Sequence, residues 1–99
     1  MELNLTGKEN LTDDDVAIVN KLVEKNAKRS NFIQSMDMRI TAHRITGARH
    51  KYSVHTKVLT DYGFFKSEAD DWKLNLAVKE ALRKLDAHMH NELKRKKGD

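Results

Sequence analysis

The chain has 99 residues, close to the usual size of one domain, and no composition break or internal repeat divides it. It contains no cysteine, which excludes disulfides, thiolate metal sites and cysteine nucleophiles and agrees with a reducing, cytoplasmic location. No stretch approaches the roughly 20 apolar residues of a membrane span, and the N-terminus lacks the apolar run of a signal peptide. We therefore expect one domain over residues 1–99, with no membrane contact and with Lys94 to Asp99 as a tail that can fray.

The N-terminal residues alternate between polar and apolar side chains, which predicts a short strand over residues 2–6 that ends at Gly7. Thr12 then precedes three aspartates, a variant of the capping box in which carboxylates lie where a helix N-terminus is partially positive. A helix is predicted from here to about Ser30 and Asn31, since those residues favour caps and turns. Its expected apolar stripe consists of Val16, Val19, Val23 and Ala27, with Leu22 at the margin.

Three further strands follow. Residues 36–45 alternate with apolar side chains on one face, residues 51–60 do the same, and the turn at residues 46–48 predicts a hairpin between them. A second turn at residues 61–63 leads to a short strand over residues 64–69. Phe32 and Ile33 are expected in the core, as are most of the aromatic residues Tyr52, Tyr62, Phe64, Phe65 and Trp72.

The last element is the clearest helix of the chain. Asp70 and Asp71 are predicted to cap it, and if it continues to Lys97 it is about 40 Å long. Its expected apolar stripe consists of Leu74, Val78, Ala81, Leu82, Leu85, Met89 and Leu93. The predicted fold class is α+β, in the order β-α-β-β-β-α, with a four-stranded sheet and two helices packed on one face.

Catalytic and metal-binding patterns are missing from the sequence. His88 and His90 point about 200° apart on a helix, so they cannot share a metal ion. His43 and His55 are predicted on the same face of neighbouring strands, but no third ligand has suitable spacing. The aspartates are explained by capping, and no nucleophile elbow or phosphate loop is present. We therefore expect no enzyme, no cofactor, no metal ion and no small-molecule substrate.

The basic residues follow a pattern on both helices. The net charge is +4, and Lys21, Lys25 and Lys28 have the spacing that aligns them along about 10 Å of helix surface. Several cations project opposite the apolar stripe of the last helix, and two helices on one face place both rows next to each other. Such a surface suits RNA phosphates better than base readout. The predicted RNA-binding residues are Lys21, Lys25, Lys28, Arg83, Lys84, Lys94, Arg95 and Lys97.

The order of elements and both end segments resemble the short form of the ribosome hibernation-promoting factor family. That family includes the ribosome-associated inhibitor and the sigma-factor modulation proteins. The opening run from Met1 to Gly7 with Leu11 and Thr12 looks like the family's first strand and helix start. The closing matches, which look like its last helix, are Ala69, Asp70, Asp71 and Trp72, followed by Ala77, Val78, Ala81, Leu82, Lys84 and Leu85.

The resemblance implies a monomeric cytoplasmic factor that binds small-subunit rRNA in the channel used by messenger and transfer RNA and so silences idle ribosomes. Two other hypotheses stay open. A double-stranded-RNA-binding-like module has the order α-β-β-β-α and reads duplex shape, although Asp70 and Asp71 would repel phosphate at the start of its second helix. A protein-interaction module, or a small enzyme, would instead use the histidine-bearing face of the sheet.

Overall fold

The computed structural model describes residues 2–28, 33–46 and 49–97, with the side chains among them except those of residues 44–46, 49 and 93–97. One short 3-10 helix, η1, accompanies four strands and two α-helices. The elements are β1 (Glu2–Thr6), η1 (Lys8–Asn10), α1 (Asp13–Ala27), β2 (Ile33–Thr46), β3 (Arg49–Thr60), β4 (Gly63–Asp71) and α2 (Leu74–Lys97).

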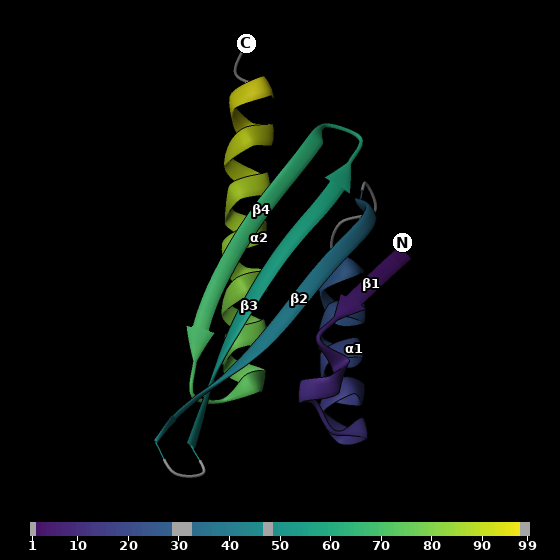
Figure 1. The fold of residues 1–99 in the computed structure, drawn as a ribbon. Helices are drawn as coiled ribbons and strands as arrows, with labels where there is room; N and C mark the ends of the chain where they lie inside the picture. Colours follow the sequence, from purple (N-terminus) through teal and green to yellow (C-terminus); the bar gives the residue numbers. More distant parts are fainter. Residues whose placement is uncertain (1, 29–32, 47–48, 98–99) are drawn as a thin grey trace.

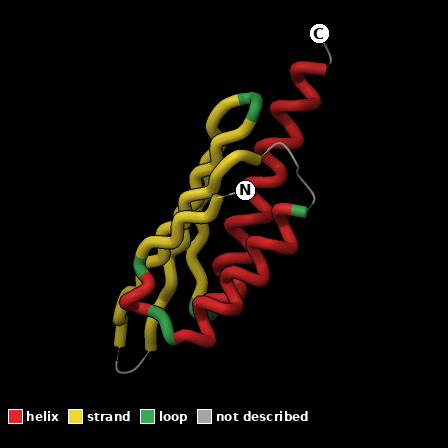
Figure 2. The backbone as a smooth tube through the Cα atoms, turned by 90° about the vertical axis from the view of Figure 1, so that its right-hand side faces the viewer, coloured by secondary structure: helices red, strands yellow, loops and turns green. Residues whose placement is uncertain are grey.

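The strands form one sheet in the order β1-β2-β3-β4, in which β1 is parallel to β2 and the other neighbours are antiparallel. A parallel pair needs a crossover, and α1 supplies it between β1 and β2. Both helices cover the same face of the sheet and run in the same direction along it (Figures 1 and 2). The opposite face of the sheet is open, and α2 continues past the end of the sheet (Figure 1). The predicted fold class and element order are confirmed.

The core lies between the sheet and the helices. Its fully buried side chains include Val19 and Val23 from α1, Met38 from β2, Val54 from β3 and Leu85 from α2. The same alternation that buries Met36, Met38 and Ile40 leaves Asp37 and Arg39 on the open face. The apolar stripes predicted from helical and strand periodicity therefore face each other across one layer of core.

Local hydrogen bonds fix where α1 begins. The Thr12 hydroxyl accepts a hydrogen bond from the Asp15 N–H at 3.1 Å, and the Asp15 carboxylate accepts one from the Thr12 N–H at 3.1 Å. This reciprocal capping box confirms the predicted helix start. Helix α1 ends at Ala27, with Lys28 as its C-cap, three residues before the predicted end at Ser30. Ser30, Asn31 and Phe32 lie outside the described residues.

Strand β1 has its predicted bounds, whereas β2, β3 and β4 are each longer than predicted. Strand β4 runs to Asp71, so Asp70 pairs with Ser53 and Asp71 with Tyr52, and the prediction that both aspartates cap α2 is wrong for Asp70. The Asp71 carboxylate does accept a hydrogen bond from the Lys73 N–H at 3.0 Å, immediately before the helix. Pairing with β3 continues the ladder through both residues, because a neighbouring strand satisfies their backbone groups.

Candidate RNA-binding interface

The three predicted lysines of α1 lie on its solvent side. Lys21, Lys25 and Lys28 are all exposed, while Val19 and Val23 on the same helix are buried. The separation follows from the 3.6-residue period, since a stripe that faces the core leaves the opposite side to water. The sequence thus predicted correctly that these side chains are exposed on the outside of the helix layer.

A groove of about 460 Å³ runs between α1 and α2 and brings cations of both helices together. Lys25 of α1 lines it with Lys79 and Arg83 of α2. Neither Lys25 nor Lys79 has an ion-pair partner among the residues that the structure describes. Of the predicted residues, Lys25 and Arg83 therefore lie at this groove, which is lined by Leu22, Lys25, Asn26, Lys79, Leu82, Arg83 and Asp86.

Arg83 is held by a carboxylate of its own helix. Its Nε donates to Glu80 at 2.9 Å and its Nη2 donates to the other oxygen at 2.5 Å, a bidentate pair one turn apart. The hydrogen bond from Arg83 lowers the pKa of the Glu80 carboxyl and raises the pKa of the guanidinium. Both side chains are largely solvent-exposed, so water screens the pair and a phosphate can compete for the guanidinium.

Lys84 follows Arg83 in sequence but lies on the other side of α2. Its ammonium donates to the Glu68 backbone carbonyl of β4 at 3.0 Å, and one turn later His88 Nδ1 lies 3.0 Å from the Lys66 carbonyl. Strand β4 is at an edge of the sheet, so on its outer side no neighbouring strand donates hydrogen bonds to these carbonyls. The structure therefore places Lys84 apart from the groove, at the β4 edge.

The last predicted RNA-binding residues belong to the C-terminal turns of α2. Lys94, Arg95 and Lys97 fall within the helix, but their side chains lie outside the described part of the structure. Two hydrogen-bond donors of the groove, Lys79 and Asn26, were missing from the predicted set. Asn26 could have been noticed, because it follows Val19 and Val23 at the spacing of the apolar stripe and is the polar residue on it.

The open face of the sheet carries a second hollow, of about 730 Å³, which is lined by residues of all four strands and by Lys84 and His88 of α2. Lys57 of β3 lies directly opposite Lys66 of β4, and Arg39 lies opposite His55 on the neighbouring row. His55 Nδ1 is 3.3 Å from the Glu68 carboxylate, and Asn4 donates to Asp37 at 3.0 Å. The hollow is therefore lined by four cations, Arg39, Lys57, Lys66 and Lys84, and by two carboxylates, Asp37 and Glu68.

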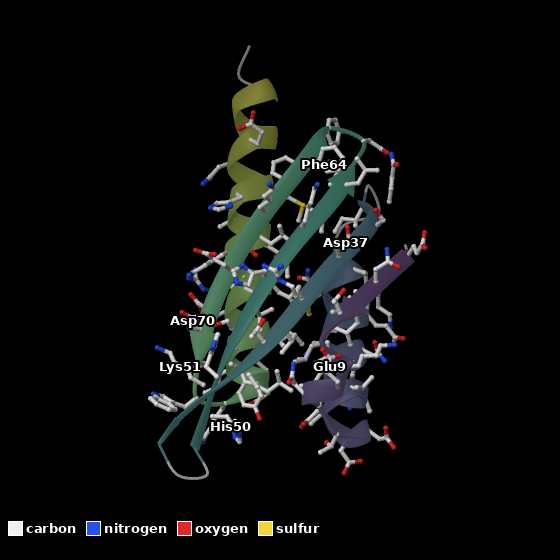
Figure 3. All side chains as sticks on the ribbon, viewed as in Figure 1. Glu9, Asp37, His50, Lys51, Phe64 and Asp70 are labelled. Carbon is white, nitrogen blue, oxygen red and sulfur yellow. The ribbon has the colours of Figure 1, made fainter. Side chains whose placement is uncertain are left out.

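The aromatic residues largely contradict the expectation that most lie in the core. Tyr62, Phe64 and Trp72 are exposed, Phe64 to 62%, while Tyr52 and Phe65 are half-buried against the core. The Lys57 ammonium is 4.6 Å from the centre of the Phe64 ring, and that of Lys51 is 5.9 Å from the Trp72 ring. Lys51 and Phe64 are seen on the open face with Asp37 and Asp70 (Figure 3).

The histidines do not assemble into a ligand set in the described part of the chain. His43 and His55 share the open face as predicted, but His43 pairs with Lys51 and His55 with Arg39, four residues further along the strand. Among the described residues, no three His, Asp or Glu side chains gather closely enough to hold a metal ion. Within the same residues, neither helix is both long and apolar enough to span a bilayer.

Solved structures share this fold. The ribosomal subunit interface protein of Coxiella burnetii superposes with a TM-score of 0.79 at 13% identity, over 95% of this chain and 99% of that one. The N-terminal domain of Thermus thermophilus Protein Y gives a TM-score of 0.60 at 14% identity, over 89% of this chain and 94% of that one. No family model and no curated protein matches the sequence. Both structural neighbours belong to the family that the sequence resembles, so the resemblance is confirmed for the fold.

Proposed function

We propose that this protein binds the small ribosomal subunit and silences idle ribosomes by occupying the channel of messenger and transfer RNA. The observation that carries the proposal is the groove that cations of α1 and α2 line together. It lies on a fold shared, over nearly its whole length, with a protein named for the ribosomal subunit interface. Lys21, Lys25, Lys28 and Arg83 would meet rRNA phosphates there, with Lys94, Arg95 and Lys97 extending the contact along α2.

The physical basis is electrostatic. Cations that neutralise phosphates release counterions from RNA, which gives affinity without base recognition. Lys25 and Lys79 form no ion pair within the described part of the chain, and Arg83 can exchange its partly exposed carboxylate partner, Glu80, for a phosphate.

Co-sedimentation with small subunits at low salt tests the proposal. The wild-type chain should travel with the subunit, and Lys21→Ala/Lys25→Ala/Lys28→Ala should remain near the top of the gradient. A matched variant with the same loss of charge, Lys8→Ala/Lys66→Ala/Lys73→Ala, should sediment like wild type, since none of its positions lies on the groove. Equal behaviour of all three proteins would contradict the proposal.

Silencing is tested separately in a cell-free translation reaction. Adding the protein to ribosomes before messenger RNA should reduce synthesis, and adding it to ribosomes already engaged on messenger RNA should have less effect, because the channel is then occupied. Equal inhibition in both orders would point to a site outside the channel.

The open sheet face favours a second candidate, a protein-interaction module. It offers the larger hollow, together with the exposed Phe64. Phe64→Ser/Lys66→Ala would weaken such a partner and leave subunit binding through the helices unchanged. A duplex-RNA module is separated by direct competition, since it would bind a plain RNA duplex as tightly as whole subunits.

A further inference from the structure

We propose that the groove between α1 and α2 seats one phosphate group of an RNA backbone, with the side-chain amide of Asn26 as its hydrogen-bond donor. The inference rests on the proposed function, because it names one contact inside the helix face that would meet rRNA. It adds a residue type that electrostatics alone does not require. A neutral amide fixes the direction and length of one hydrogen bond, whereas the lysines supply positive charge.

Asn26 is the observation that carries the proposal. It is only 7% exposed, and its Nδ2 has no hydrogen-bond acceptor among the described residues. Buried polar groups are almost always hydrogen-bonded, and an unsatisfied donor costs free energy in the folded protein. An acceptor that arrives with a partner would remove this cost.

Asn26 also occupies a position where the helical pattern calls for an apolar side chain. It stands on the apolar stripe of α1 after Val19 and Val23, at a place where Leu or Val would satisfy the helical pattern. Leu22 and Leu82 line the same groove and would accommodate an apolar side chain. The fold alone therefore gives no reason for an amide here.

The charges around the groove define the missing acceptor. Lys25, Lys79 and Arg83 line it, so an acceptor with negative charge is favoured over a neutral carbonyl. The planar fork of Arg83 matches two oxygens of a phosphate. Nδ2 is closed to solvent in the unbound protein, so binding requires the side chains that cover it to shift and admit a phosphate oxygen.

Asp86 adds a negative charge to the groove. Its carboxylate lines the groove and is engaged in an interaction of its own. A phosphate in the groove is repelled by this carboxylate and attracted by Lys25, Lys79 and Arg83, so three cations outweigh one carboxylate. An RNA backbone suits this groove because the exposed Lys21 and Lys28 on α1 can hold the neighbouring phosphates.

The test compares stability with binding in the full chain. Asn26→Leu should raise the urea midpoint, because an unsatisfied donor is replaced by an apolar side chain, and should weaken small-subunit binding about tenfold. Asn26→Ala should weaken binding similarly whatever its stability. Asn20→Leu, an exposed position on the same helix, is the matched control and should bind like wild type. Asp86→Asn should bind more tightly.

Side-chain amide resonances identify the ligand. Titration of the free protein with inorganic phosphate, a short RNA or an acidic peptide should shift the Asn26 NH₂ signals with RNA and weakly with phosphate. A shift with the acidic peptide alone would assign the groove to a protein and overturn the proposal. So would wild-type subunit binding by both Asn26 variants; if Lys21→Ala/Lys25→Ala/Lys28→Ala still loses binding, the proposed function stands without this site.

Discussion

Gly7 is a single residue on which the start of the fold depends. Its φ of +93° lies in the left-handed region, and a Cβ built there would be 2.0 Å from the backbone oxygen of Ile40. A backbone atom cannot move aside as a flexible side chain can. The β1–η1 junction therefore passes across β2 at a distance that only glycine allows.

We expect Gly7→Ala to destabilise the protein by about 3 kcal/mol, since it combines backbone strain with a clash against β2. Urea denaturation measures the loss. Gly63→Ala is the control, because Gly63 also has a positive φ, +119°, but open space around it. A Gly63 variant as unstable as the Gly7 variant would show that strain alone, and not contact with Ile40, accounts for the effect.

Glu80 competes with RNA for Arg83. Glu80→Gln removes the bidentate ion pair, so small-subunit affinity at low salt should rise a few-fold, and Glu80→Gln/Arg83→Gln should lose the gain. The hydrogen bond from Arg83 lowers the pKa of Glu80, so the pair is intact above the ordinary carboxyl range and is lost as pH falls through the lowered pKa. In Arg83→Gln the pKa of the Glu80 carboxyl, followed by NMR titration, should rise because the largest cause of its lowering is removed.

At the scale of elements, α2 is tied to the edge strand β4 by side chains that reach its backbone. Lys84 and His88 meet the carbonyls of Glu68 and Lys66, and the Ser67 hydroxyl of β4 donates to the Ala81 carbonyl of α2 at 2.7 Å. Helix side chains thus cover carbonyls that a free edge would expose to another strand.

Lys84 should therefore stabilise the edge strand β4 more than it contributes to RNA binding. We expect Lys84→Ala to speed hydrogen exchange of β4 amides and to cost about 0.5–1.5 kcal/mol of stability, the value of one net hydrogen bond. Subunit binding should fall less than in Arg83→Ala. If Lys84→Ala loses binding as fully as Arg83→Ala while β4 exchange is unchanged, the lysine belongs with the RNA-binding residues after all.

At the scale of the whole molecule, the two faces differ in character. The groove on the helix face is lined by Lys25, Lys79 and Arg83 with one carboxylate, whereas the hollow on the sheet face is lined by four cations, two histidines and two carboxylates. Salt dependence can assign binding to one of them. The slope of log affinity against log salt should be shallower by about 2 units in Lys21→Ala/Lys25→Ala/Lys28→Ala, at about 0.7–0.9 for each lost phosphate contact. An unchanged slope would place the phosphate contacts elsewhere.

The sequence by itself determined the features that depend on local periodicity and local hydrogen bonds. Alternation predicted which faces of β2 and β3 are buried, and helical spacing predicted the stripes of α1 and α2. The Thr12–Asp15 capping box, closed within four residues, placed the start of α1. The solvent side of Lys21, Lys25 and Lys28 followed from the same period.

Only the tertiary structure decided what depends on a neighbour distant in sequence. Asp70 and Asp71 look like helix caps locally, but pairing with β3 extends β4 through both. Arg83 and Lys84 are adjacent on α2, yet Arg83 lines the groove between the helices, whereas Lys84 donates a hydrogen bond to the backbone of the edge strand β4. In the sequence, Asn26 is only a polar residue on an apolar stripe. It lines a groove because α2 packs beside α1, and local sequence patterns specify each helix surface but not how the two helices pack.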